Sequence, residues 1–119
     1  MSDGEILRIG VADAQSIRPE SGRLSSLAWQ RGSMQLRYYQ PPVPDPQTPH
    51  AQDELYVVIA GTARFVCDGR ASACGAHDVL FAAAGSAHRF EQPSADFAVW
   101  VIFYGPQGGE GRSPRPARG

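Results

Sequence analysis

Proline and glycine divide this chain into short segments, and none of these segments has the apolar periodicity of an amphipathic helix. Several alternate apolar with polar residues instead, as residues 34–38 do, and turn residues separate most of them. Many short strands at close spacing predict an all-β domain, either a single antiparallel β-barrel or a flattened two-sheet sandwich. The predicted strands are Glu5–Val11, Leu24–Trp29, Met34–Tyr39, Glu54–Ala60, Thr62–Cys67, Ala71–Cys74, Asp78–Ala82, His88–Glu91 and Phe97–Tyr104.

The apolar residues suffice for one core. The chain has 119 residues, 42% of them hydrophobic, so it is long enough for one domain and too short for two. Two almost continuous apolar runs, Leu55–Ala60 and Phe97–Tyr104, are expected at the centre of sheets. Beyond them the sequence is rich in Gly, Pro and Arg and offers little apolar surface to bury. We therefore predict a β domain over residues 1–104 and a disordered tail over residues 105–119.

The two cysteines flank a predicted hairpin turn. If Asp68-Gly69 forms a two-residue turn, Cys67 pairs with Arg70 and Cys74 falls opposite Ala63. The two sulfur atoms would then be too far apart for disulfide geometry. Both cysteines are expected as reduced thiols that serve as small apolar residues.

Charge and hydropathy argue against two classes of partner. The formal net charge of -1 gives no field that would recruit nucleic acid or an anionic membrane. No apolar run approaches the ~18 residues of a membrane span. The first five residues also lack the positive and apolar regions of a signal peptide. We expect a cytoplasmic protein that binds neither nucleic acid nor membrane.

Histidine and glutamate stand beside β-type sequence at two separate places. His50 and Glu54 lie at the start of one predicted strand, and His88 begins another. Two neutral imidazoles and one carboxylate form a ligand set for a divalent transition metal with open coordination positions. Because side chains alternate along a barrel strand, His50 and Glu54 can both point inward, and His88 can close the site from another wall. One metal ion is expected, and Fe, Mn, Ni, Zn and Cu all remain open.

A small-molecule pocket is expected at the mouth of such a barrel. The proline-rich segment Gln40–Pro49 leads into His50, so it forms either a rim over the pocket or a plain connector. Arg37 and Arg89 could clamp a carboxylate, although lone arginines on strands are usually solvated. His77 is expected as a surface imidazole. The candidate lining residues are Gln47, Thr48, Gln52, Tyr56, Arg89, Phe90 and Trp100, and for those on strands core packing or exposure is an equal alternative.

The first of these regions resembles a motif of the cupin superfamily. In that motif a His-x-His pair is followed after three or four residues by Glu, and then by six residues and Gly. Glu54 and Gly61 stand at the last two positions, and His50 stands at the second His in the three-residue version. Thr48 occupies the position of the first His, so the resemblance implies two His and one Glu where the family has three His and one Glu.

The second region resembles the other cupin motif, Pro-x-Gly-x-x-His. Gly85 and His88 match its spacing, whereas Ala83 replaces the Pro and Gln92 replaces an Asn that usually follows the His. The resemblance covers about residues 34–104 and implies a single-domain cupin jelly roll.

Because the first His is missing, no protein ligand is assigned to the fourth coordination position. A threonine hydroxyl is a poor ligand, so water or a substrate atom would fill the vacancy, or Gln47 or Gln52 would contribute an amide oxygen. In the four-residue register the ligand positions would be Gln47 and Pro49, and proline cannot bind metal. We therefore prefer the register that uses His50.

Three alternative functions are open for such a chain. The first is a metal-dependent enzyme, a dioxygenase or an isomerase, that acts on a small organic substrate. The second is a non-catalytic module that binds or senses a small molecule. The third is a structural barrel in which the His and Glu side chains bond one another without metal. Small cupins commonly pair through edge strands, so a homodimer is expected, with Leu24–Trp29 and Tyr38–Tyr39 supplying apolar surface.

Overall fold

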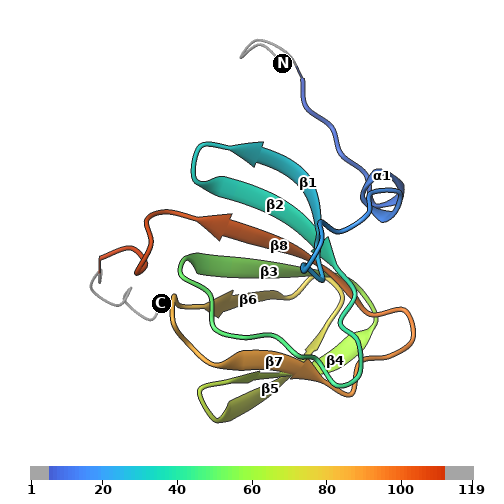
Figure 1. Cartoon of the computed structure of the whole chain (residues 1–119). Coiled ribbons are helices and arrows are strands. Elements are labelled where there is room, and N and C mark those ends of the chain that lie inside the picture. Colours follow the sequence, from blue (N-terminus) through green and yellow to red (C-terminus); the bar gives the residue numbers. More distant parts are fainter. Residues whose placement is uncertain (1–5, 112–119) are drawn as a thin grey trace, which may run out of the picture.

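The computed structural model describes residues 6–111, which form two antiparallel sheets and one short helix (Figure 1). The five-stranded sheet has the order β1-β2-β8-β3-β6, and the three-stranded sheet has the order β5-β4-β7. The elements are α1 (Val11–Gln15), β1 (Ser26–Arg31), β2 (Met34–Tyr39), β3 (Asp53–Ala60), β4 (Thr62–Cys67), β5 (Arg70–Gly75), β6 (Val79–Ala82), β7 (His88–Glu91) and β8 (Ala98–Tyr104).

The predicted all-β architecture is confirmed, in the form of two facing sheets. The two nearly continuous apolar runs become β3 and β8, and each of these strands pairs on both sides within the larger sheet. This is the central position that their apolar character predicted. Within residues 6–111 the backbone hydrogen bonds group the strands as two separate sheets, so a fully closed barrel is not formed.

The core lies between the sheets and is rich in aromatic side chains. Tyr56 on β3 points toward Phe65 on β4 and Phe90 on β7, with ring centroids 5.7 and 5.0 Å away. Phe65 and Phe90 also contact each other, at 5.2 Å. All three side chains are buried, so they hold the two sheets together at the level of β3, β4 and β7.

The N-terminal prediction was wrong, because no strand forms over residues 6–11. Ile6 is 93% exposed and has no sheet face to cover it. The helix α1 begins after Gly10, whose backbone N–H donates to the Asp13 carboxylate at 2.8 Å. Ala14 on this helix packs against Tyr38, so the helix covers part of the outer face of the larger sheet.

The predicted hairpin around the cysteines is confirmed. Cys67 pairs with Arg70 and Ala63 lies opposite Cys74. Asp68 and the following glycine both have positive φ, 48° and 79°, as a type I′ turn requires. Both thiols are free.

The predicted disordered tail starts too early at Gly105. Up to Glu110 the chain is tied to β3, where the buried Asp53 carboxylate accepts a hydrogen bond from the backbone N–H of Glu110 at 2.9 Å. Gly109 passes so close that a Cβ there would meet an Asp53 oxygen at 2.8 Å. Backbone N–H groups therefore hold this segment although it has little apolar surface. The rest of the predicted tail, residues 112–119, lies outside the described residues.

No helix within residues 6–111 has the length and apolar character needed to cross a membrane.

Candidate metal centre

Three side chains converge between the two sheets. His50, Glu54 and His88 each offer one ligand atom, and these atoms lie within 4.8 Å of one another. His50 Nδ1 is 3.1 Å from Glu54 Oε2, and His88 Nε2 is 2.5 Å from Glu54 Oε1. The Glu54 and His88 side chains are 1% exposed, whereas that of His50 is 30% exposed. The cluster is thus buried on one side and reachable from the side of His50.

The three residues come from three different parts of the fold. Glu54 lies on β3 of the larger sheet, and alternation along the strand places its side chain on the same inner face as Tyr56. His88 is the first residue of β7 in the smaller sheet. His50 lies on the loop before β3, and its carbonyl accepts a hydrogen bond from Gly85 N–H at 2.8 Å. That bond ties the loop of His50 to the turn that leads into His88.

The ligand atoms lack well-aligned hydrogen bonds. His88 Nδ1 is 3.0 Å from the Ser86 carbonyl oxygen, which places an N–H on Nδ1 and turns Nε2 toward Glu54. His50 Nδ1, Glu54 Oε2 and His88 Nε2 are all buried and have no partner in hydrogen-bond geometry. Since buried polar atoms are nearly always satisfied, these three converging atoms fit a cation between them.

The charges of the cluster also favour a cation. Burial would raise the pKa of Glu54, but close polar contacts with His50, His88 and Tyr56 and the charge of His88 outweigh it and lower that pKa to about 2. Burial would lower the pKa of His88, yet the contact with Glu54, its charge and the Ser86 carbonyl together raise it. A buried carboxylate that is ionised at neutral pH therefore needs a positive charge beside it, from a protonated imidazole or from a metal ion.

A tyrosine and an amide extend the cluster into the proline-rich loop. The buried Tyr56 hydroxyl donates to Glu54 Oε1 at 2.5 Å, and Gln47 Oε1 lies 3.1 Å from the same hydroxyl. Burial, followed by the charge of Glu54, raises the pKa of Tyr56, so this hydroxyl stays protonated and remains a donor. The Gln47 amide nitrogen donates in turn to Asp45 at 2.8 Å.

Asp45 anchors this network in the core. Its carboxylate accepts hydrogen bonds from the Tyr39 hydroxyl at 2.5 Å and from the Phe90 backbone N–H at 2.9 Å. Asp45 is not among the residues predicted from the sequence, because a single aspartate between two prolines looks like an ordinary turn residue. Of the two roles considered for the proline-rich segment, the network supports the rim over a cavity.

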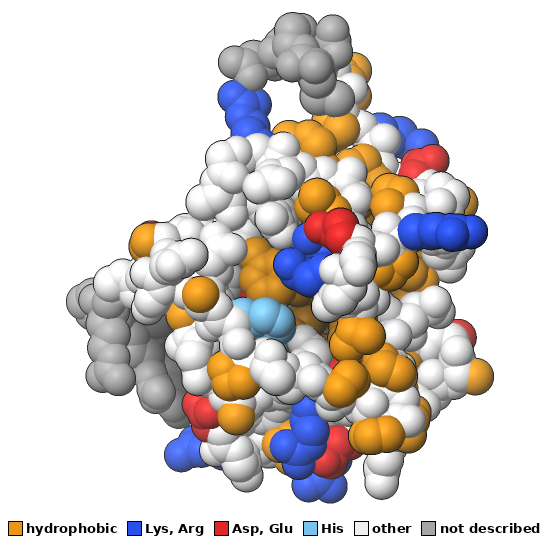
Figure 2. Space-filling view, in the orientation of Figure 1, with side chains coloured by type: hydrophobic (Ala, Val, Ile, Leu, Met, Phe, Trp, Pro, Cys, Tyr) orange, Lys and Arg blue, Asp and Glu red, His pale blue; other side chains and the backbone are white. Residues whose placement is uncertain are grey.

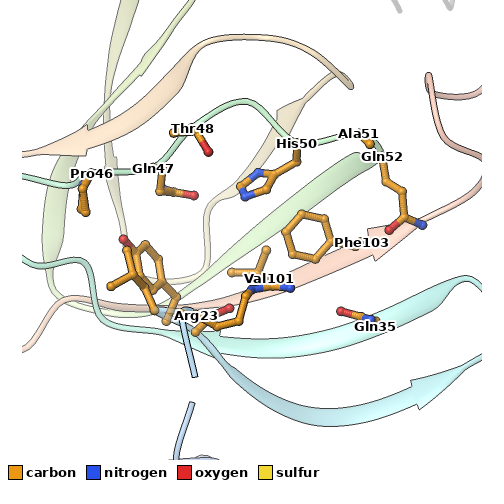
Figure 3. A pocket seen from close by; sticks show the side chains of 14 residues that line it. Arg23, Gln35, Pro46, Gln47, Thr48, His50, Ala51, Gln52, Val101 and Phe103 are labelled. Atoms are coloured by element: carbon orange, nitrogen blue, oxygen red, sulfur yellow. The ribbon is translucent and has the colours of Figure 1, made fainter. Parts of the chain in front are cut away.

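A cavity of about 490 Å³ opens beside His50 (Figure 3). Figure 2 shows a hollow in this face of the molecule with a histidine side chain at its bottom and an arginine beside it. Its wall includes three of the residues suggested from the sequence, Gln47, Thr48 and Gln52. It also includes residues not predicted from the sequence, among them Arg23, Gln35, Tyr39, Val101 and Phe103.

Three other suggested lining residues lie away from the cavity. For two of them the reason is that side chains alternate between the two faces of a strand. Arg89 follows His88 and so points outward, where it pairs with Glu91 at 2.8 Å. Trp100 lies on the outer face of β8, with its ring 6.0 Å from that of Tyr38. Phe90 points inward but is covered by the aromatic core. None of the three borders the cavity.

The remaining sequence suggestions also have definite positions. Tyr56 does not border the cavity but contacts Glu54 from within the core. Arg37 is buried and engaged with Glu20, so it is not free to clamp a ligand. His77 is exposed, as predicted, and has φ of 76° in the turn before β6.

Comparisons with known proteins agree with this fold. A model of the cupin domain family matches residues 37–104. An uncharacterized protein of Streptomyces coelicolor is 38% identical over 63 residues, which are 53% of this chain and 60% of that protein. The match thus covers less than two thirds of that relative's length.

Solved structures are similar to the chain at the level of the fold. A cupin 2 conserved barrel domain protein from Salinispora arenicola aligns with a TM-score of 0.63 and 18% identity, over 85% of this chain and 91% of that one. An iron(II) form of HppE, crystallised with an alternative substrate, aligns with a TM-score of 0.64 and 12% identity, over 87% of this chain and 62% of that one. Two sheets with a His and Glu cluster between them, together with a family match over more than half its length, show that this chain belongs to the cupin family.

Proposed function

We propose that this protein binds one divalent transition metal ion through His50, Glu54 and His88 and acts on a small organic substrate, as a dioxygenase or an isomerase. One observation carries the proposal. Three buried ligand atoms without hydrogen-bond partners converge beside an open cavity. A metal ion would satisfy all three at once, and the cavity would bring a small molecule to it.

The donor set suits several metals, and iron(II) is the first to test. Two imidazole nitrogens and one carboxylate with open positions are the ligand type of non-haem iron oxygenases, while Mn, Ni, Zn and Cu also accept nitrogen and oxygen ligands. A metal held there would supply Lewis-acid or redox chemistry to the cavity.

The surrounding residues have separate roles in this proposal. Ser86 holds the tautomer of His88, so that Nε2 faces the site. Tyr56 donates to Glu54 Oε1 and thereby leaves Oε2 for coordination. Thr48 borders the cavity on the same loop as His50, where the cupin motif places another His (Figure 3). The resulting vacancy is the position at which water or substrate would enter.

One observation favours a second candidate, a non-catalytic module that binds a small molecule. Only His50 of the three residues borders the cavity, whereas Glu54 and His88 lie behind it. Such burial would leave a metal ion little open surface. Water-proton relaxation of the Mn²⁺-loaded protein separates the two candidates. Rapidly exchanging water on the bound ion supports the enzyme, and its absence supports the binding module.

Metal analysis tests the proposal directly. The protein should be purified without a His tag from metal-replete cells and should contain about one metal ion per chain. His88→Ala should lose most of this metal, because a buried ligand is removed, while His77→Ala should keep it as the matched control. If the wild-type protein binds no transition metal, the His and Glu side chains form a structural network and the proposal fails.

A further inference from the structure

The cavity beside His50 has an arginine in its wall. Its wall includes the Arg23 side chain, and no aspartate or glutamate borders it among the described residues. Figure 3 shows Arg23 on the far side of the cavity from His50, with its guanidinium below Val101 and Phe103. Arginine stays protonated at all ordinary pH values. A ligand in this space therefore meets a cation on one side and the candidate metal centre on the other.

The segment that carries Arg23 is fixed at both ends by a buried arginine. Arg37, which is 1% exposed, donates to both carboxylate oxygens of Glu20, at 3.0 and 2.8 Å. The same guanidinium donates to the Ser25 carbonyl at 3.1 Å. Between these two points the backbone N–H of Arg23 donates to the backbone carbonyl of Glu20 at 2.9 Å, which closes a turn. The position of Arg23 at the cavity thus follows from the contacts of its segment with the buried Arg37.

This arrangement leaves the positive charge of Arg23 available to a ligand. Glu20 gives both of its carboxylate oxygens to Arg37, so the Arg23 guanidinium is left without a carboxylate partner there. Within residues 6–111, no carboxylate oxygen lies within ion-pair distance of Arg23. Burial and the nearby charge of Arg37 both lower the pKa of Arg23, and Glu20 opposes them less strongly. A ligand anion would relieve the repulsion between the two cations.

We propose that the cavity binds a small organic carboxylate, whose carboxylate group pairs with Arg23 and whose body lies against Val101 and Phe103 toward His50. The planar guanidinium has the fork of donors that fits a carboxylate, and the apolar wall suits a short hydrocarbon or aromatic body. This inference names the substrate class for the function proposed above and rests on that function for its biological meaning. A divalent ion held by a single carboxylate would add to the positive field in the cavity.

Benzoate and benzamide form a matched pair of probes, since they have the same body and differ in charge. Binding is measured by titration calorimetry and by amide chemical shifts, with both the metal-loaded and the chelator-treated protein. Benzoate should bind at millimolar concentration or below and shift the resonances of Gly22–Ser25 and Phe103, while benzamide should bind at least about tenfold more weakly.

Arg23→Gln should weaken benzoate binding about tenfold in both forms of the protein and leave benzamide binding unchanged. Arg70→Gln is the control, because it changes the net charge equally at an exposed hairpin away from the cavity. Arg23→Lys keeps the charge and loses the fork, so its benzoate affinity should fall between those of wild type and Arg23→Gln.

The two proposals can fail separately. If benzoate does not bind the wild-type protein, or if Arg23→Gln binds it as tightly as wild type does, the carboxylate site is refuted, whatever the metal content. If benzoate binding depends on Arg23 but no metal binds, the carboxylate site stands and the metal-dependent function fails.

Discussion

Glu54 should make the metal-free protein sensitive to acid. Its pKa in the folded protein is about 2, against an ordinary value of 4.5. Because the folded-state pKa is the lower of the two, the ionised carboxylate stabilises the fold fully above pH 4.5, and this stabilisation is lost as the pH falls toward 2. The difference corresponds to about 3 kcal/mol of unfolding free energy.

The assay compares the wild-type protein with Glu54→Gln in the presence of a chelator. Denaturant unfolding is followed by the fluorescence of Trp29 and Trp100 at several pH values between about 5 and 2, where histidines are protonated in the unfolded chain. The wild-type protein should lose about 3 kcal/mol more stability over this interval than Glu54→Gln does. Taking the difference removes the contributions of carboxyl groups that both proteins share.

A surface glutamate supplies the control for this experiment. Glu91 pairs with Arg89 on the outside of β7, and its side chain is 37% exposed. Glu91→Gln should therefore show the acid sensitivity of the wild-type protein. If Glu54→Gln loses as much stability as the wild-type protein, Glu54 is not held ionised by its neighbours, and the argument from the buried cluster is wrong.

Three further predictions follow from the same structure. Thr48→His should raise metal affinity by filling the open position. If Gln47→His raises metal affinity and Thr48→His does not, the motif has four residues, not three, between its second ligand position and Glu54. Metal affinity should fall as the pH is lowered from about 8 to about 6, because protons compete with the ion for His88, whose pKa is raised. Competition titrations with a chelating dye measure this affinity, and an affinity that does not change with pH counts against His88 as a ligand. We propose a homodimer that covers the edge strand β6, where Val79 and Phe81 are 61% and 50% exposed. Phe81→Asp should therefore give monomers in light scattering. A wild-type monomer at high micromolar concentration would refute the dimer.

The surface suggested earlier for that dimer is corrected in part. Tyr38 and Tyr39 are 6% and 3% exposed, so they are already covered within one chain. Tyr38 packs under α1 and beside Trp100, and Tyr39 turns inward to Asp45. Sequence alternation alone could not reveal this, because a helix was not expected over the outer face.

Local patterns were sufficient for most of the strands and for the candidate ligands. The predicted bounds of β2, β4 and β7 coincide with those observed, since alternation and turn residues depend only on neighbours in the sequence. The three candidate ligands His50, Glu54 and His88, which were expected together from motif spacing, also lie close to one another in the structure.

Features that depend on distant contacts were not predictable. Arg23 reaches the cavity because Arg37 binds Glu20, which lies 17 residues earlier in the chain. Residues 105–111 are held because Asp53, far earlier, accepts a backbone hydrogen bond from Glu110. Neither pairing leaves a periodic signal, because each joins a strand to an irregular segment.

The amide side chains near the candidate centre decide how the vacancy at Thr48 is filled. Gln47 donates to Asp45 at 2.8 Å and places its amide oxygen 3.1 Å from the Tyr56 hydroxyl, so coordination would cost it both contacts. Gln52 donates to the Ser33 and Gly105 carbonyls, at 3.0 and 2.9 Å, which holds its amide group toward the C-terminal segment.

Neither amide is therefore placed to replace the missing histidine without breaking hydrogen bonds that hold the loop or the C-terminal segment. In the proposed metal site, the vacancy would be left to water or to a ligand that enters through the cavity. Arg23 borders the same cavity from the side opposite His50. A carboxylate ligand would then be oriented by Arg23 at one end while its body approaches the open coordination position, so the loss of one histidine and the placement of one arginine would serve the same ligand.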